Sequence, residues 1–234
     1  MGLRYASRPP VLALALVAAA TQACWRTGEP TPSDAIVAWA AYPESVRVGD
    51  TFLFEFAGPV TPTACGRLDT ATLAIEAGAI TLEARRSTFS AVCANQRISF
   101  YEARPLAIDS AGAYPVTTAD GRELGTLVAT DSGPFSGIVT IGEGTVREAA
   151  GCVFFGPGWI GGQRIFALTG VPEPVRRVAG SDRVVYVRGT LRGFSFCGNW
   201  GSRPRIRVDT AWVTDREAAD WYGASETPTD EGSE

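Results

Sequence analysis

The chain has 234 residues, of which 45% are hydrophobic and 20% charged, and a formal net charge of −4. This composition excludes a collagen, a coiled coil and a polyampholyte tail, and 26 Gly with 15 Pro are more than a helical bundle tolerates. The chain contains no His and no Lys, and all 21 basic residues are Arg. A Ser-His-Asp triad, a Cys-His pair, a His-ligated zinc site, Schiff-base chemistry and a P-loop are therefore excluded.

The first 24 residues have the pattern of an export signal. Arg4 and Arg8 give a basic start, and ten apolar residues follow at 11–20. A run of ten apolar residues is too short to span a bilayer as a helix. The segment therefore predicts export rather than a transmembrane anchor.

The residues at the end of this segment indicate a lipid anchor. The small residue Ala23 precedes Cys24, and Thr21 stands where an aliphatic residue is usual in the family that this pattern resembles, the bacterial lipobox. The resemblance implies a signal peptide at 1–23, lipidation of Cys24, and a protein held at a membrane of the cell envelope. Two alternatives stay open: ordinary cleavage after Ala23, which gives a soluble secreted or periplasmic protein, and a cytosolic N-terminus.

The cysteine count agrees with the lipid anchor. Five cysteines are present, and if Cys24 is acylated an even set of four remains, which suits an oxidising compartment. Of the three ways to pair them, only Cys65–Cys93 with Cys152–Cys197 keeps each disulfide inside one half of the chain. Unpaired buried thiols and a four-cysteine zinc site are weaker alternatives, the second because no C-x2-C pair exists.

The remaining sequence divides into four parts. Residues 24–34 are polar and rich in Pro and Thr, and predict a lipidated tether. Residues 25–131 carry a net charge of −5 and residues 132–221 a net charge of +3, and the residues just after 131 are Ser, Gly and Pro. These features predict a domain boundary near 131. Residues 222–234 carry four acidic groups and no basic one, which is typical of a disordered acidic tail.

Residues 35–131 have the pattern of short strands joined by turns. Turns are expected at Ala77-Gly78 and Asp120-Gly121, between apolar or alternating segments. The expected strands are 35–41, 51–56, 72–76, 80–84, 97–101, 113–118 and 124–130. About seven strands without a long helix predict an antiparallel β-sandwich.

This part resembles bacterial immunoglobulin-like domains. The resemblance rests on the turn at 48–51 before an alternating strand, on Cys65 after that strand, and on Cys93 after the next hairpin. The stretch 108–116 is similar to a tyrosine corner, with Tyr114 in the corner position. The resemblance implies an Ig-like sandwich, a domain type used mostly for spacing and adhesion.

Residues 132–221 are also rich in strand patterns. The expected strands are 135–141, 152–155, 164–169, 183–191 and 203–212, with a compact non-strand segment at 170–174. Five strands with one such insert predict a small barrel. The alternation in the last strand places Trp212 with Ile206 on the core face, as Trp39 is expected to be in the first half. A capping box at Thr214–Glu217 predicts a short C-terminal helix packed by Trp221.

This second part resembles the OB-like domains of exported bacterial proteins. The resemblance rests on Cys152 in a strand, the element Leu168–Pro172, the strand Val187–Leu191, and Cys197 before the last strand. The implied fold class of the whole chain is all-β, with an N-terminal Ig-like antiparallel β-sandwich, a C-terminal OB-like small β-barrel and a short C-terminal helix.

No motif predicts catalysis or a bound cofactor or metal. Residues 156–161 match G-x-G-x-x-G, but Pro157 removes one of the backbone donors that a dinucleotide phosphate needs, and no helix pattern follows. Paired carboxylates catalyse glycoside hydrolysis without His, so a carboxylate-dependent hydrolase is an alternative. The candidate acids are Glu102, Asp109, Glu143 and Glu148.

The strongest candidate for a binding surface is a set of arginines and aromatics in the second half. The arginines Arg183, Arg188, Arg192, Arg203, Arg205 and Arg207 lie on two expected neighbouring strands and their connection, and the aromatics Trp159, Phe194, Phe196 and Trp200 lie in adjacent loops. OB-folds bind single strands or sugars with such surfaces. The simpler interpretation is that Arg replaces Lys throughout and these are solvated strand faces.

The sequence therefore predicts a non-catalytic cell-envelope lipoprotein that acts as a binding or structural module at the cell surface. The alternative is a glycan- or polyanion-binding protein using Arg188, Arg203, Arg205, Arg207, Trp159 and Trp200 as its ligand face. The expected partners are the membrane, through the anchor, and an envelope protein or glycan. Nucleic acid is not expected as a partner of an exported protein.

Overall fold

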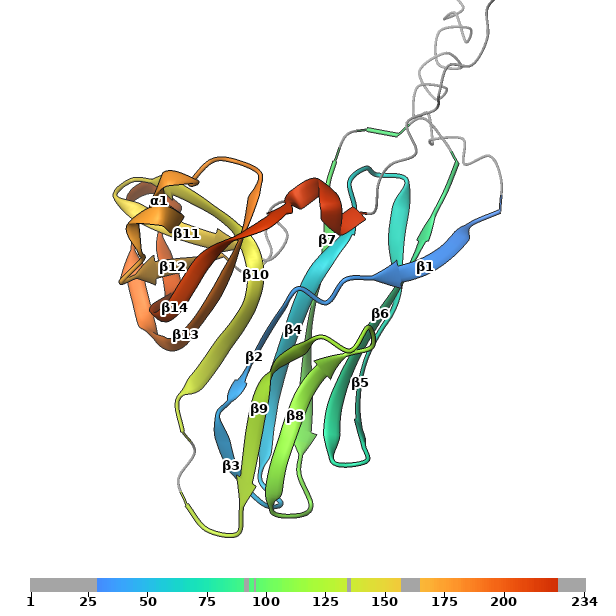
Figure 1. Ribbon diagram of the computed structural model, residues 1–234, viewed down its shortest axis with the longest axis vertical. Coiled ribbons are helices and arrows are strands. Elements are labelled where there is room, and N and C mark those ends of the chain that lie inside the picture. Colours follow the sequence, from blue (N-terminus) through green and yellow to red (C-terminus); the bar gives the residue numbers. More distant parts are fainter. Residues whose placement is uncertain (1–28, 91–92, 95, 134–135, 157–164, 223–234) are drawn as a thin grey trace, which may run out of the picture.

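The computed structural model describes residues 29–90, 93–94, 96–133, 136–156 and 165–222. Within these residues the chain is all-β, with fourteen strands, one five-residue α-helix and two short 3-10 helices. Figure 1 shows a long sandwich of strands with a small barrel at its side. The predicted signal peptide, Cys24 and Trp159 lie outside the described residues, as does the tail beyond residue 222.

The first sheet of the sandwich has six strands, in the order β1-β6-β8-β9-β3 with β5 also paired to β6. These strands are β1 (Thr31–Ala35), β3 (Ser45–Arg47), β5 (Gly66–Glu76), β6 (Ala79–Thr88), β8 (Gly112–Thr118) and β9 (Glu123–Thr130). Residues 31–34 were expected in the tether, but they pair with β6 as an edge strand. Pro32 is tolerated there because the N–H group that proline lacks is not needed on the open side of an edge strand.

The second sheet of the sandwich is formed by β2 (Trp39–Pro43), β4 (Thr51–Thr61), β7 (Ile98–Ala107) and β10 (Ile138–Ala149). Its inner face packs on the first sheet through a buried cluster that includes Phe54, Phe56, Leu82, Leu127 and Ile141. The alternating residues Phe52, Phe54 and Phe56 all enter this core, because every second residue of a strand faces the same way. The predicted sandwich is confirmed, although two strand pairs of its first sheet, β6 with β8 and β3 with β9, are parallel and not antiparallel.

Local turn chemistry places the hairpins where the sequence predicts them. Ala77 and Gly78 have φ of 49° and 78°, and Gly121 has φ of 82°, as tight hairpin turns require. The Tyr114 hydroxyl donates to the carbonyl oxygen of Ser110 at 2.9 Å. This is the backward hydrogen bond of a tyrosine corner.

The second half closes into a barrel. Its elements are β10, β11 (Cys152–Gly156), β12 (Phe166–Thr169), α1 (Glu173–Arg177), β13 (Arg183–Phe196) and β14 (Ser202–Glu217). Hydrogen bonding runs in the circuit β10-β11-β12-β14-β13-β10, in which β12 and β14 are the one parallel pair. A closed circuit of five strands is the small barrel that the sequence predicts, and with a helix between the third and fourth strands its arrangement is like that of OB-folds.

The sandwich and the barrel share β10. Residues 138–142 pair with β2 on one side, residues 139–144 pair with β13 on the other, and residues 145–149 pair with β11. Trp39 of β2 is fully buried in the barrel core, with its ring centroid 5.1 Å from that of Phe166. The sheet is therefore continuous from one half of the chain to the other, although the connection at 131–137 lies at the predicted boundary.

The prediction that Trp212 faces the core is wrong. Trp212 is 48% exposed and stacks on Tyr186, at 4.0 Å between ring centroids. The cause is a β-bulge: Arg188 pairs with Thr210 and the next residue pairs with Val208, so that Asp209 is skipped. An extra residue reverses the alternation of the strand beyond it, which turns Trp212 outward.

The C-terminal helix begins later than the predicted capping box. Residues 214–217 belong to β14, where the Thr214 hydroxyl donates to the carbonyl oxygen of Val184 at 3.0 Å. The 3-10 helix η2 (Ala218–Tyr222) follows, and Trp221 is buried against Val184 and Ala218. The predicted packing role of Trp221 is confirmed.

Both predicted disulfides are present. Cys65–Cys93 joins the loops after β4 and β6, with 5.4 Å between the Cα atoms, and Cys152–Cys197 has 5.8 Å between them. Two disulfides are typical of a protein in an oxidising, extracytoplasmic compartment. None of the helices in the described residues is long and apolar enough to cross a membrane.

Candidate functional site

The β13–β14 hairpin extends past the barrel and folds over its outer surface. We call residues 192–203 the hairpin tip. The strands stay paired out to Phe196 and Ser202, and the 3-10 turn η1 (Gly198–Trp200) closes the tip. The Cys152–Cys197 disulfide fastens the tip to β11. Because the bridge leaves from the end of the hairpin, the tip is held at both its base and its end.

The underside of the tip is apolar. Phe154 and Ala167, which face out of the barrel from β11 and β12, are buried beneath it together with Cys197. Trp200 packs on Phe154, with 5.2 Å between ring centroids. The tip therefore sits on a small core of its own, separate from the core inside the barrel.

Between the tip and β12 lies a groove of about 550 Å³. Its lining comes from β11 and the residue before it, from β12 and the residue after it, from α1, from the tip and from β14, and comprises Gly151, Cys152, Val153, Ala167, Leu168, Thr169, Gly170, Arg176, Phe194, Ser195, Phe196 and Arg205. The second and third strands of an OB-like barrel and the loop between its fourth and fifth strands are where such barrels bind ligands. This groove, which we call the barrel groove, is therefore the candidate site.

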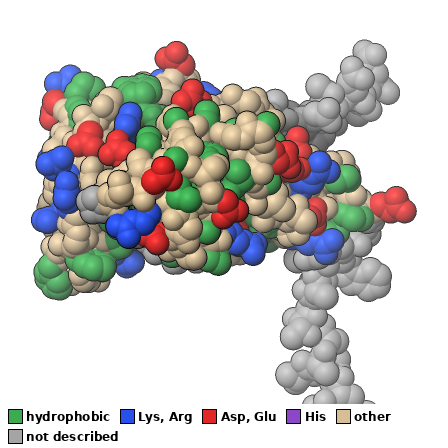
Figure 2. All heavy atoms as spheres, turned by 90° about the horizontal axis from the view of Figure 1, so that it is seen from below, with side chains coloured by type: hydrophobic (Ala, Val, Ile, Leu, Met, Phe, Trp, Pro, Cys, Tyr) green, Lys and Arg blue, Asp and Glu red, His purple; other side chains and the backbone are tan. Residues whose placement is uncertain are grey.

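Two aromatic side chains at the barrel groove are unusually exposed. Phe194 is 67% and Phe196 80% exposed, and they lie two residues apart on β13. Large apolar side chains that gather on a surface mark interaction sites more often than isolated ones do. Seen from below, the barrel end of the molecule, on the left, carries green and blue side chains close together (Figure 2).

Two arginines at the barrel groove supply positive charge. The Arg205 Nε donates to the carbonyl oxygen of Arg192 at 2.9 Å. This bond fixes the Nε side of the guanidinium group and leaves its two Nη atoms for a ligand. Within the described part of the chain, no carboxylate lies within ion-pair distance of Arg205. Arg176 of α1 lies 3.9 Å from Glu148 in a half-exposed pair. The groove therefore has a basic rim.

The structure divides the predicted arginine face. Arg203 and Trp200 lie on the tip, where the Arg203 Nε donates to the carbonyl oxygen of Trp200 at 2.9 Å. Arg207 pairs with Asp209 at 3.5 Å. Arg188 pairs with Glu44 at 3.7 Å and faces Thr210, five residues along β14 from Arg205, a separation of about 16 Å. Arg188 is therefore not part of the barrel groove.

Arg176 is the groove residue that sequence reasoning missed. It lies in the compact segment after β12, which carried no pattern beyond its prolines. Its place at the groove depends on α1 packing across the barrel through the buried Val175. A helix of five residues has too little periodicity for its outward face to be predicted.

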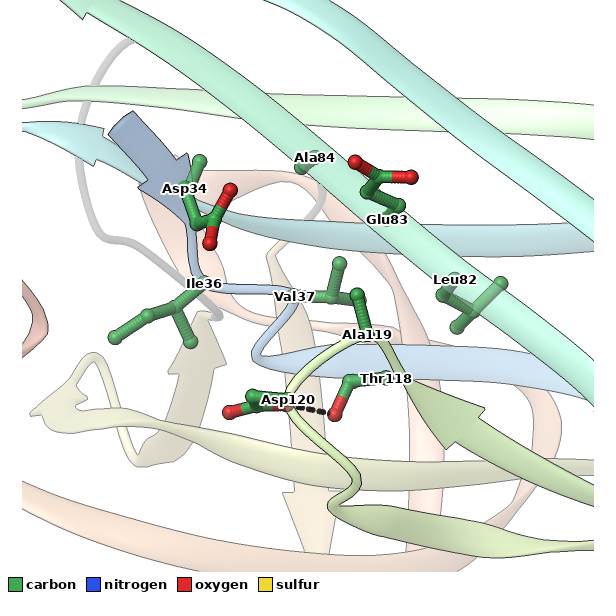
Figure 3. A pocket seen from close by; sticks show the side chains of 10 residues that line it. Asp34, Ile36, Val37, Leu82, Glu83, Ala84, Thr118, Ala119 and Asp120 are labelled. Carbon is green, nitrogen blue, oxygen red and sulfur yellow. Dashed lines mark hydrogen bonds between the residues drawn. The ribbon is translucent and has the colours of Figure 1, made fainter. Parts of the chain in front are cut away.

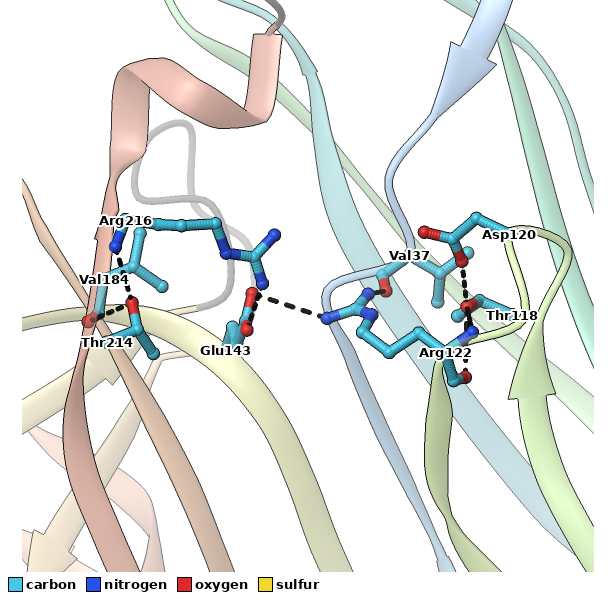
Figure 4. Close-up of polar contacts among 8 residues, drawn as sticks. All are labelled: Val37, Thr118, Asp120, Arg122, Glu143, Val184, Thr214 and Arg216. Atoms are coloured by element: carbon cyan, nitrogen blue, oxygen red, sulfur yellow. Dashed lines mark hydrogen bonds and ion pairs between the residues drawn. The ribbon is translucent and has the colours of Figure 1, made fainter.

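Glu143 is the one buried carboxylate among the candidate acids that lies in an ion-pair cluster. Its two oxygens face Arg122, with 3.4 Å between the Arg122 Nη1 and Glu143 Oε2 atoms, and Arg216, which donates to Oε1 (Figure 4). Arg122 also donates to the carbonyl oxygen of Val37. The cluster joins the β8–β9 turn, β10 and the end of β14, so it holds the sandwich and the barrel together.

Replacing Glu143 by Gln is expected to lower the free energy of unfolding by about 2 kcal/mol, because two arginines lose a buried partner while both stay partly solvated. Urea unfolding measures this loss. The matched control is Glu173→Gln, which removes an exposed pair with Arg177 on α1 and is expected to cost less than about 0.5 kcal/mol. Equal losses in the two variants would contradict a joining role for Glu143.

Three acids are among the residues around a small hollow in the sandwich. Asp34, Glu83 and Asp120 are among the residues around a cavity of about 80 Å³ (Figure 3). Glu83 is paired with Arg85 at 2.6 Å, and Asp120 accepts a hydrogen bond from Thr118. No group of three potential metal ligands occurs among the described residues. The hollow therefore carries no chemistry that the sequence or the geometry supports.

Comparison with known proteins adds no relative: no protein-family model, no curated protein and no solved structure matches the chain. The interpretation of the barrel groove therefore rests on its own geometry.

Proposed function

We propose that this protein is a non-catalytic, ligand-binding lipoprotein of the bacterial cell envelope, which is anchored through Cys24 and binds an anionic glycan in the barrel groove. The observation that carries the proposal is the exposure of Phe194 and Phe196 beside Arg205 and Arg176. Flat aromatic surfaces pack against the apolar faces of sugar rings. Guanidinium groups bind carboxylate or sulfate groups with two parallel hydrogen bonds.

The ligand class follows from the compartment as well as from the groove. Disulfides and the export pattern support a site outside the cytoplasm, where polysaccharides are available and nucleic acid is not the expected ligand. The absence of His and Lys supports binding over turnover, because the usual nucleophile and base pairs cannot be assembled.

The proposal is tested by calorimetric titration with oligogalacturonate, an acidic sugar chain, and with a dextran oligosaccharide of similar length, which is neutral. We expect the acidic chain to bind at least about tenfold more tightly. We expect Arg205→Gln, and Phe194→Ala combined with Phe196→Ala, each to weaken binding by about tenfold or more.

The control for these variants is Arg85→Gln, which removes an exposed arginine on β6 in the sandwich and is expected to bind as the unaltered protein does. Equal affinity for the acidic and neutral chains would rule out recognition by the arginines. Loss of binding in Arg85→Gln as well would show that only net charge matters.

The anchor is tested separately by the intact mass of the protein from the membrane fraction. We expect a polypeptide that starts at Cys24 and carries several acyl chains, and we expect Cys24→Ser to move the protein to the soluble fraction. An unacylated polypeptide beginning at Cys24 would point instead to ordinary secretion.

A further inference from the structure

A second site follows from the way the chain passes between the two sheets of the sandwich. β3 pairs with β9 in parallel, but only over Ser45–Arg47 with Val128–Thr130. The chain before Glu44 does not continue along β9, because it runs in the other sheet as β2. The edge of β9 over residues 123–127 is therefore left without a neighbouring strand among the described residues.

The backbone of Thr126 points out of this edge. Thr126 stands opposite Pro115 of β8, which has no N–H to give to the ladder. Two residues on, the Val128 N–H donates to the carbonyl oxygen of Glu44, away from β8, at 3.0 Å. Residues two apart in a strand present their N–H and C=O groups to the same side. Both groups of Thr126 therefore face away from β8.

A cavity of about 290 Å³ lies along this edge. Its lining comprises Tyr42, Glu44, Glu123, Gly125, Thr126, Val128, Val139, Ile141 and Arg188. Tyr42 is buried, its hydroxyl donates to the carbonyl oxygen of Leu124 at 3.3 Å, and burial raises its pKa well above the usual range. Gly125 leaves the room for that hydroxyl, since a Cβ there would lie 2.5 Å from it. We call this cavity and the β9 edge the edge slot.

The walls of the edge slot have distinct chemistry. Val139 and Ile141 of β10 form an apolar wall. At the rim, Arg188 is paired with Glu44. Glu123 has no ion-pair partner among the described residues, so one negative charge at the rim is left to attract a cation.

We infer that the edge slot binds a short extended peptide by strand addition, with an apolar side chain on Val139 and Ile141 and a basic side chain beside Glu123. Two hydrogen bonds to the backbone of Thr126 hold the added strand, as in other cases of strand addition. The chain's own acidic tail is disfavoured as the occupant, because residues 222–234 carry four acids and no basic residue. This site lies in the sandwich and does not depend on glycan binding in the barrel groove.

The test is an NMR titration of the 15N-labelled protein, without its predicted signal peptide, with a synthetic peptide, acetyl-Arg-Val-Thr-Val-Arg-amide. We expect the Thr126 amide to shift and to become protected from hydrogen exchange. The acidic peptide acetyl-Glu-Val-Thr-Val-Glu-amide is expected to bind about tenfold more weakly, and Glu123→Gln to reduce that preference.

Backbone pairing is tested by Thr126→Pro, which removes the outward N–H and is expected to weaken binding by about tenfold or more. The matched control is Thr126→Ala, which keeps the N–H and is expected to bind as before. If Thr126→Pro does not fold, the backbone N–H groups of the peptide are removed instead. One peptide is N-methylated at the central Thr and the other at both Val residues, and strand addition requires that at least one of them fails to bind. The inference is overturned if the Thr126 amide does not respond to millimolar basic peptide, if both peptides bind equally, or if N–H removal has no effect.

Discussion

Replacing Cys152 and Cys197 together by alanine is expected to lower the free energy of unfolding by about 4 kcal/mol and to weaken the proposed glycan binding in the barrel groove by about tenfold or more. The stability loss follows from the 45 residues between the two cysteines, because an open chain of this length gains entropy when unfolded. The binding loss follows from the hairpin tip, which carries Phe194 and Phe196 and is fastened at its end by this bridge alone among the described disulfides. Urea unfolding and calorimetric titration measure the two effects.

The second disulfide provides the control. Cys65 and Cys93 are 28 residues apart, so their joint replacement by alanine is expected to cost about 3.5 kcal/mol, nearly as much. Because this bridge lies in the sandwich, glycan affinity is expected to remain. If both double variants lose binding equally, the effect comes from general destabilisation and not from the position of the tip.

Replacing Trp39 by alanine is expected to lower the free energy of unfolding by about 4 kcal/mol. Trp39 is fully buried, and it reaches from a sandwich strand into the core of the barrel, where it contacts Phe166. Its removal leaves a large cavity in that shared core. Far-ultraviolet circular dichroism during urea unfolding is expected to show one transition, shifted to lower urea.

The matched control for Trp39 is another tryptophan. Trp212→Ala removes a half-exposed ring stacked on Tyr186, and is expected to cost about 1 kcal/mol. Similar losses for Trp39→Ala and Trp212→Ala would mean that the sandwich and the barrel do not depend on a shared core.

Much of the fold was predictable because its signals are local. The turns at Ala77-Gly78 and Asp120-Gly121 each contain a glycine, Gly78 or Gly121, which adopts the required positive φ without steric cost. The pairing of the four described cysteines followed from parity and from the two halves of the chain. Short-range chemistry of this kind can be read from sequence because the interacting groups are neighbours.

The features that the sequence did not predict depend on contacts between residues that are far apart in the chain. Nothing local shows that β10 pairs with β2 as well as with β11 and β13. The bulge at Asp209 reversed the strand face, which turned Trp212 outward. The arginines of the predicted face are divided between two places: Arg205 lines the barrel groove, and Arg188 lies at the edge slot. The sequence could not show this division, because the order of arginines along two strands does not reveal which of them lie together in the folded protein.

The shared strand β10 gives the molecule a mechanical property. Between Ile138 and Ala149 it is hydrogen-bonded to β2 and β13 and then to β11, so this segment contains no hinge. A load applied at the hairpin tip passes along these ladders into the sandwich as shear between paired strands. The barrel is therefore held at a fixed orientation to the sandwich, and a ligand bound in the barrel groove as proposed would be held in the same orientation (Figure 1).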